Sequence, residues 1–155
     1  MVKVASRKVD LKRGVDHIGV CVCFLIHDGK GNLMLHKRGT GARDENGRWD
    51  IGGGAIEFGE KIEDAVRREI KEEFKCPVLD MEFLTAYEAQ RRHDGQDTHW
   101  IALVHSVRVD PTQVKNGEPK KIESIGWFNR KTLPSPLHSQ FDKTYKVAIE
   151  NNIIK

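Results

Sequence analysis

The stretch from Glu60 to Lys75 constrains the fold most, because it contains no glycine or proline, is rich in good helix formers and is stopped by Pro77. At about 100° per residue, its apolar side chains share one continuous face that spans about 180°. That face consists of Ile62, Ala65, Val66, Ile70 and Phe74. The sequence therefore predicts an amphipathic helix over residues 60–75 that packs on a core.

Three carboxylates of this helix project from the core-facing side. Glu72, Glu69 and Glu73 lie at about 280°, 340° and 20° on the same helical wheel, among the apolar residues. A run of glutamates is usually a solvated face, but Glu69 and Glu73 are a like-charged i, i+4 pair whose repulsion grows on desolvation. Arg68 can orient a carboxylate but cannot neutralise three. A hard divalent cation, Mg²⁺ or Mn²⁺, prefers such oxygen ligands, and no Cys or His lies on that face to favour zinc.

Three consecutive glycines, Gly52 to Gly54, come shortly before this helix. Glycine has no side chain to block the approach of a ligand or metal to the backbone, and a carbonyl oxygen here would serve as a further metal ligand. A tight or mobile turn is the alternative interpretation of a triple glycine. Next to acidic side chains that face inward, the binding interpretation is favoured.

The remaining periodic segments predict strands and one further helix. Ile18 to Ile26 is β-branched and aromatic, and the turn signal Asp28–Asn32 separates it from the alternating run Leu33–Arg38, so a hairpin is expected. Further strands are expected at 81–89, 100–109 and 125–128, with a charged hairpin tip at 91–95. A last helix is indicated by the spacing of Leu137, Phe141, Tyr145, Ala148 and Ile149. Strands mixed with two helices predict an α/β or α+β sandwich.

Composition narrows the class of protein. The 155 residues include 26 Lys and Arg against 23 Asp and Glu, a formal charge of only +3, and 38% are hydrophobic. A dedicated nucleic-acid-binding domain would carry a localised basic excess, and disorder would need fewer apolar residues. Three cysteines without a CxxC pair indicate reduced thiols and neither a disulfide framework nor a zinc site.

Length and targeting signals indicate a single domain outside the membrane. This length fits one domain with its own core, and the longest apolar run, 18–26, is well short of the roughly 20 residues that span a bilayer. The polar start, Met1–Arg13, lacks the apolar segment of a signal peptide. We expect a single cytoplasmic domain over 1–155, with residues 1–15 as a short N-terminal extension or edge strand, and no nucleic-acid or membrane partner.

The spacing from Gly54 through the helix resembles the Nudix box, which reads G, five residues, E, seven residues, R-E-aliphatic-x-E-E-x-G-aliphatic. Gly54, Glu60 and the run Arg68–Glu73 fall at its positions. Two positions depart from it: Lys75 replaces the closing glycine, and Gly52 replaces the proline that usually precedes the glycine pair. Softer motifs over roughly residues 16–140 are similar to the MutT-type branch of nucleotide pyrophosphatases, among them Lys37-Arg38-Gly39, His99-Trp100 and Asn116–Glu123.

The resemblance implies a mixed β-sheet flanked by helices and a metal-dependent hydrolase. Its Mg²⁺, or Mn²⁺, would neutralise phosphate oxygens and activate a water molecule. The implied substrate is a small-molecule nucleotide, a nucleoside triphosphate or its oxidised form, giving the monophosphate and pyrophosphate. ADP-ribose or a nucleotide sugar is the alternative substrate, and a non-catalytic ligand sensor is the alternative of another class. Many relatives pair, so a homodimer is compatible with the resemblance.

The roles of the box residues follow by position. Glu69 and Glu73 are implied as the principal metal ligands, Glu72 as a third ligand or water-activating group, and the Gly54 carbonyl as a further ligand. Arg68 would position the carboxylates. Glu60 would be structural, through exposed backbone N–H groups of the first helical turn.

Residues outside the box carry weaker signals. Glu118, Glu123 and Glu88 are candidates for an additional base or metal ligand, with Glu118 the first choice because it matches the branch motif; a solvated charged loop is the alternative. For substrate binding the candidates are the Gly53 backbone, Arg38, which is otherwise a surface cation, and Trp127. Trp127 would stack on a base, although an aromatic in an Ile-Gly-Trp-Phe strand more often belongs to the core.

Overall fold

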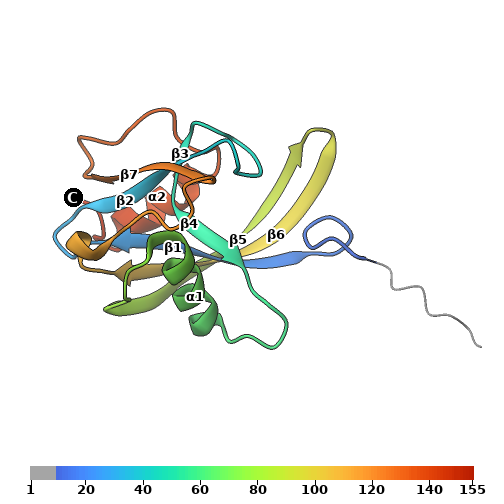
Figure 1. Ribbon diagram of the computed structural model, residues 1–155, viewed down its shortest axis with the longest axis horizontal. Coiled ribbons are helices and arrows are strands. Elements are labelled where there is room, and N and C mark those ends of the chain that lie inside the picture. The colour runs from blue at the N-terminus through green and yellow to red at the C-terminus, as the bar shows by residue number, and fades with distance from the viewer. Residues whose placement is uncertain (1–9) are drawn as a thin grey trace, which may run out of the picture.

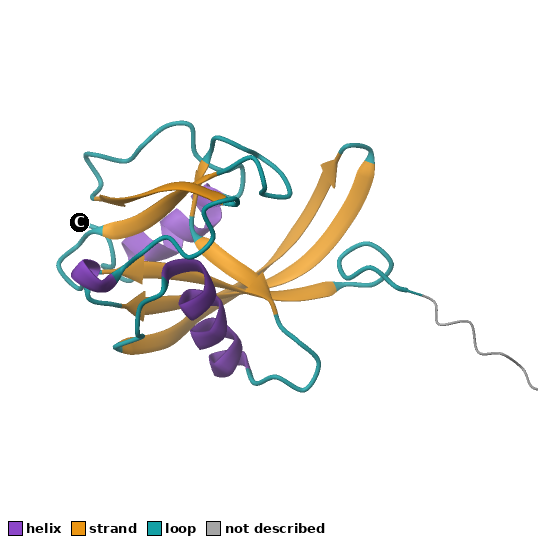
Figure 2. Cartoon of the chain, in the orientation of Figure 1, coloured by secondary structure: helices purple, strands orange, loops and turns teal. Residues whose placement is uncertain are grey.

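A computed structural model describes residues 10–155 as one mixed β-sheet with a helix on each face (Figures 1 and 2). The strands are β1 (Gly19–His27), β2 (Leu33–Arg38), β3 (Trp49–Asp50), β4 (Gly52–Ala55), β5 (Asp80–His93), β6 (Gln96–Arg108) and β7 (Ile122–Phe128). The helices are α1 (Ile62–Phe74), α2 (Phe141–Glu150) and a short 3₁₀ turn, η1 (Pro111–Gln113). The expected fold class is confirmed.

Strand β1 is the centre of the sheet, whose strand order is β3-β2-β1-β6-β5. β1 pairs in parallel with β6 along its whole length, and over Cys21–Phe24 it pairs antiparallel with β4. The predicted hairpin between β1 and β2 exists, but their register has the single pair His27 and Leu33, because β4 occupies that edge of β1 further along. β7 pairs with the other side of β2.

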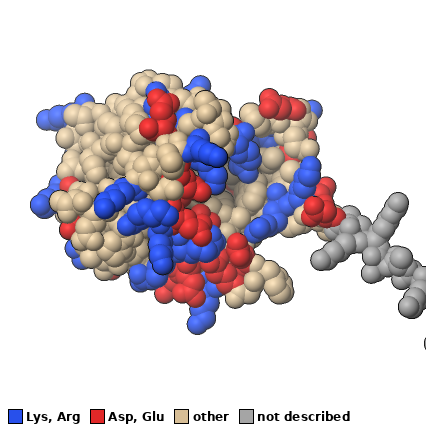
Figure 3. Space-filling view, in the orientation of Figure 1, with Lys and Arg blue, Asp and Glu red and all other residues tan. Residues whose placement is uncertain are grey.

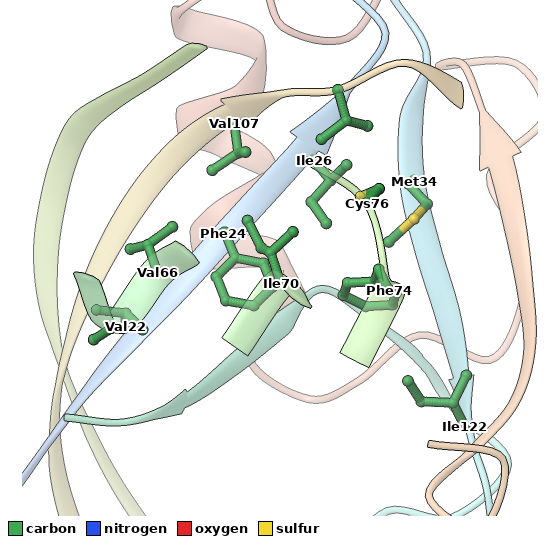
Figure 4. Packing of buried hydrophobic residues seen from close by; sticks show 12 residues of the cluster. Val22, Phe24, Ile26, Met34, Val66, Ile70, Phe74, Cys76, Val107 and Ile122 are labelled. Carbon is green, nitrogen blue, oxygen red and sulfur yellow. The ribbon is translucent and has the colours of Figure 1, made fainter. Parts of the chain in front are cut away.

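Alternation along β1 divides the core into two clusters. Val22, Phe24 and Ile26 face α1, where Ile70 and Phe74 pack on them (Figure 4). Leu25 faces the opposite side and belongs to the cluster that contains residues of α2. Burial of this stripe supplies most of the drive for α1 to form, since large apolar side chains gain roughly 1.5–3 kcal/mol each on burial.

Helix α1 is shorter than predicted. It begins at Ile62, two residues after Glu60, and Ile62 is 44% exposed, so the apolar face does not extend to the first turn as expected. The helix ends at Phe74, and Lys75 follows with a φ of 53°. Glycine is the residue that usually adopts this left-handed conformation at a helix end, which is the place of glycine in the family pattern. Lys75 therefore keeps the usual helix exit at some conformational cost.

Strands β5 and β6 form a long hairpin that projects from the body of the molecule (Figure 1). The charged tip predicted at 91–95 is confirmed, with the turn at Asp94-Gly95, although both strands are longer than expected. Leu137 precedes α2 and forms a bridge with Trp49, so it is not helical.

The N-terminal expectation is only partly described. Residues 1–9 lie outside the described residues, and within 10–15 the only extended pairing is a bridge between Arg13 and His17. Among residues 10–155, no helix has the length and apolar character needed to cross a bilayer.

Candidate active site

The glycines of β4 bring the backbone against two carboxylates of α1. A Cβ added at Gly54 would lie 2.0 Å from Glu69 Cδ, and one added at Gly52 would lie 2.9 Å from Glu73 Oε2. The triple glycine is therefore an ordered strand at close approach to the acidic side chains, and the alternative of a mobile turn is wrong. Figure 3 shows Asp and Glu side chains gathered where α1 lies in Figure 1, with Lys and Arg beside them.

Arg68 ties the site together from within α1. Its Nε and Nη2 donate to the two carboxylate oxygens of Glu60 at 2.7 and 2.9 Å, and its Nη1 donates to Glu69 Oε1 at 2.7 Å. Nη2 also donates to the Ala55 carbonyl at 3.1 Å. This two-point geometry fixes the guanidinium and, through it, one side of the Glu69 carboxylate.

The partner of Glu60 differs from the predicted one. Glu60 accepts the bonds of Arg68 and the N–H of Glu57, which lies before the helix, in place of an N–H group of the first helical turn. Hydrogen bonding to Arg68 lowers the pKa of Glu60 to about 2. Glu60 is thus structural, as expected, but acts through the arginine.

Glu73 is the least satisfied of the acidic groups. Its Oε2 is buried without a hydrogen-bond partner among the described residues. Burial, and then the charges of Glu69 and Glu118, raise the pKa of Glu73 well above its ordinary value. Burial likewise raises the pKa of Glu69. Two desolvated carboxylates so close together need compensating positive charge.

Glu72 is held more loosely than its two neighbours. Its side chain is 53% exposed, and its contact with Arg68 is 3.5 Å long. Within residues 10–155, no three or more His, Cys, Asp or Glu side chains together form an enclosed metal site. Glu69 and Glu73 beside the Gly54 backbone nevertheless fit a hard cation of the Mg²⁺ type, because Mg²⁺ usually takes one or two carboxylates and keeps several waters.

A loop docks on the end of α1 and delivers Glu118. The N–H groups of Lys115 and Gly117 donate to the Phe74 and Glu73 carbonyls at 2.9 and 2.8 Å, which satisfies groups that a helix end leaves free. Glu118 then faces the carboxylates and accepts from Lys121 Nζ at 2.9 Å. That hydrogen bond raises the pKa of Lys121.

The other two candidates for an outside base lie elsewhere. Glu88 is exposed on β5, and Glu123 is paired with Lys37 at 2.8 Å. Neither lines the cavity that holds the box carboxylates. Of the three glutamates, the structure brings only Glu118 to the site.

The acidic side chains line a cavity of about 600 Å³. Gly53 and Gly54 line it, as do Glu69, Glu72 and Glu73. Its other lining residues include aromatic, thiol and polar groups, namely Cys21, Cys23, Tyr87, Trp100, His138 and Gln140. The size suits a drug- or nucleotide-sized ligand, and the mixture of apolar walls with a few polar groups is typical of small-molecule sites.

The structure corrects two of the predicted substrate contacts. Arg38 lines the cavity, but its guanidinium is already committed to Asp44 at 2.7 Å and Asp50 at 3.3 Å, so it is not a free cation. Trp127 packs against the core cluster under α1 and does not line the cavity.

Sequence reasoning missed an ion-pair network in the wall of the cavity. Asp44 is 3% exposed and pairs with both Arg38 and Arg91, while Arg91 also reaches Glu45 at 3.2 Å. Burial opposes ionisation of Asp44, but Arg91 and Arg38 outweigh it and lower its pKa. Burial raises the pKa of Asp50 and lowers that of His138. Positions 44 and 91 are far apart in the sequence, so no local pattern signals their pairing.

Comparison with known proteins identifies the family. A NUDIX domain model matches residues 16–148. The chain belongs to the Nudix family. The expected resemblance is thereby confirmed, and members of this family generally use divalent metal cations.

Among curated relatives, this Nudix chain is 32% identical over 133 residues to a mouse protein, 8-oxo-dGDP phosphatase NUDT18, covering 84% of this chain and 38% of that protein. It is 46% identical over 58 residues to nucleoside triphosphatase NudI of Escherichia coli (strain K12 / DH10B), covering 37% of this chain and 40% of that one. The chain thus spans less than half the length of these relatives.

Solved structures of other Nudix proteins share the fold. The MutT NUDIX hydrolase from Burkholderia pseudomallei superposes with a TM-score of 0.74 at 28% identity, covering 84% of this chain and 97% of that one. The NUDIX domain of Shewanella oneidensis NrtR, complexed with ADP ribose, gives a TM-score of 0.71 at 16% identity, with 87% and 88% covered. The second likeness shows the fold alone.

Proposed function

We propose that the protein is a Mg²⁺- or Mn²⁺-dependent pyrophosphohydrolase that cleaves a nucleoside triphosphate, or an oxidised nucleoside triphosphate, to the monophosphate and pyrophosphate. The observation that carries the proposal is the buried Glu73 Oε2, which has no hydrogen-bond partner among residues 10–155 and lies beside Glu69 in the wall of a nucleotide-sized cavity. Such a pair of carboxylates is stable in its charged form only when a cation joins it.

In this proposal Glu69, Glu73 and the Gly54 carbonyl hold the cation, with Glu72 as an outer ligand. When bound, the cation neutralises the diphosphate oxygens and lowers the pKa of the attacking water. Arg68 keeps Glu69 in place through its bond at 2.7 Å, and Glu60 in turn fixes Arg68. Removing the Glu60 carboxylate would therefore loosen Glu69 without touching it directly.

Glu118 is the proposed general base. Its Oε1 accepts from Lys121, and its Oε2 has no hydrogen-bond donor among the described residues, so Oε2 can take a proton from water. The Lys121 ammonium lies in the same cavity wall and offsets negative charge there. The loop amides that cap α1 hold this base at a fixed place relative to Glu73.

The substrate assignment is supported by the cavity and by the relatives. Tyr87 and Trp100 line the cavity and offer aromatic surface for a nucleobase. The described activities of NUDT18, an 8-oxo-dGDP phosphatase, and NudI, a nucleoside triphosphatase, concern nucleoside polyphosphates. ADP-ribose is the second candidate, because the similar NrtR domain was solved with it.

The proposed substrate also bears on the location and assembly of the protein. A free nucleotide substrate fits a cytoplasmic protein that has no nucleic-acid or membrane partner. Pairing into a homodimer stays a prediction, to be checked by light scattering on the purified protein.

The test is a substrate panel assayed with Mg²⁺ and with Mn²⁺. It contains nucleoside triphosphates, oxidised dNTPs, ADP-ribose, diadenosine polyphosphates and nucleotide sugars. We expect cation-dependent release of pyrophosphate from one of the triphosphates. Glu73→Gln should abolish turnover and keep the fold, whereas Glu63→Gln, an exposed glutamate of the same helix, should leave turnover unchanged. Full activity of Glu73→Gln would contradict the metal-site assignment.

A further inference from the structure

Two thiols face the cavity side by side. Cys21 and Cys23 alternate along β1 and therefore project to the same face of the sheet, and both line the cavity. Cys21 is next to Ala102 of β6, which is next to Tyr87 of β5 in the same register. The residue between Cys21 and Tyr87 in this register therefore has a small side chain.

The two thiols are poorly placed to form a disulfide with each other. Residues i and i+2 of an extended strand are about 6.6 Å apart, and their Cβ atoms point the same way, whereas a disulfide needs a Cβ separation of about 3.8 Å. The reaction available to Cys21 is therefore with a molecule that enters the cavity.

The surroundings shift the pKa values of the two thiols in opposite directions. The Cys23 thiol, as a hydrogen-bond donor, and then the charges of Arg43 and Arg91 lower the pKa of Cys21 against the effect of burial. The bond to Cys21 and then burial raise the pKa of Cys23 well above its ordinary value. Packing separates them too: Cys23 packs against the core cluster that contains residues of α2, and its sulfur lies against Gly53, whereas Cys21 belongs to neither core cluster. Because the thiolate is the reactive form of cysteine, Cys21 is the nucleophile of the pair and Cys23 supports it.

The Arg43 guanidinium selects the reagent. Arg43 lines the cavity, lies over the Trp100 ring 5.7 Å from its centroid, and is 63% exposed with only a long contact of 3.6 Å to Asp44, whereas Arg91 is already paired with Asp44 and Glu45. Arg43 would attract a small molecule that carries carboxylates. A peptide disulfide such as glutathione disulfide has this charge and can deliver sulfur to a thiolate.

We propose that Cys21 is a covalent modification site for small anionic disulfides and that the adduct fills the nucleotide cavity and stops hydrolysis. In the reaction, the Cys21 sulfur attacks one sulfur of the disulfide, a new S–S bond forms at Cys21, and the other half leaves as a thiolate. A dithiol reverses the step by the same exchange. The effect on activity rests on the proposed function, while the position of the adduct does not.

The experiment treats the full chain with glutathione disulfide and locates the adduct by intact mass and peptide mapping. We expect one adduct, on Cys21, with turnover lost in proportion to the fraction modified and restored by dithiothreitol. Cys76, which is buried in the core under α1, is the internal control and should stay free. An adduct on Cys23 or Cys76, or an unmodified Cys21, would overturn the proposal, as would full modification of Cys21 with undiminished turnover.

Variants separate reactivity from structure. Cys21→Ser should take up no glutathione, and whatever turnover it retains should be insensitive to the disulfide. Cys23→Ala, which removes the donor, should slow adduct formation several-fold, whereas Cys23→Ser, which keeps a donor, should react faster than Cys23→Ala. Equal rates for these two would refute the supporting role of Cys23. A chain that hydrolyses no nucleotide of the panel would contradict the proposed function alone, because the adduct is located by mass.

Discussion

Replacing Gly54 by alanine would place a methyl carbon 2.0 Å from Glu69 Cδ. Because the atoms in its way are the far end of a flexible side chain, the carboxylate moves and the strand stays. A normal carbon–carbon contact is about 3.5 Å, so the displacement is about 1.5 Å. A misplacement of about 1 Å can cost about 100-fold in rate. We therefore expect kcat/KM to fall about 100-fold, or about 2.7 kcal/mol of transition-state stabilisation.

The assay compares initial rates of pyrophosphate release over a range of Mg²⁺ concentrations, with urea unfolding as the check on the fold. Gly47→Ala is the control, because it should lower stability without disturbing the carboxylates. The methyl group at position 47 would meet no atom within 4 Å, but its φ of 82° is strained for alanine. That variant should lose about 1 kcal/mol of stability at unchanged kcat/KM. Wild-type kcat/KM in Gly54→Ala, or inactivity caused only by unfolding, would refute the reasoning.

Three further predictions concern stability, measured by urea unfolding. Burial lowers the pKa of His36 to about 4. Between about pH 6.5 and 4, His36 is therefore protonated in the unfolded chain but neutral in the native state. The free energy of unfolding should therefore fall by up to about 3 kcal/mol on acidification across this window. His36→Asn should reduce that fall, and an unchanged fall in the variant would contradict the lowered pKa of His36. Lys75→Gly should relieve the left-handed φ of 53° and raise the free energy of unfolding by about 1 kcal/mol, whereas Lys71→Gly inside the helix should lower it by a similar amount. Asp44→Asn should cost about 3 kcal/mol, because it leaves largely buried guanidinium groups without their partner, while Asp97→Asn in an exposed pair should cost almost nothing.

The sequence predicted what periodicity and spacing encode. The inward position of Glu69 and Glu73 followed from the helical wheel, and the structure places both beside the glycine strand. The same wheel overestimated the burial of Ile62 and Glu72, which are both exposed, because it assumes that the whole apolar face of the helix is covered. What covers a helix depends on neighbours that lie far away in the sequence, and here α1 is covered only from Ala65 onward.

The ion-pair network in the cavity wall could not be predicted for the same reason. Arg91 was assigned to a charged hairpin tip, and that assignment did not show that its guanidinium pairs with Asp44, a residue of another loop. Arg38 was assigned to phosphate because a single sequence does not show the two carboxylates that already engage it. Side-chain ion pairs between loops have no period and no fixed spacing, so they become visible only in three dimensions.

The capping of α1 by a distant loop has a consequence for transplanting this catalytic helix. Since the Lys115 and Gly117 amides occupy the carbonyls of Phe74 and Glu73, the helix and the loop form one cooperative unit although about 40 residues separate them. A designer who grafts the box helix alone onto a new scaffold would leave two carbonyls bare and would lose Glu118 as well. The smallest portable module of this enzyme is therefore discontinuous, and an inserted residue between 114 and 118 would disable it as surely as one inside the box.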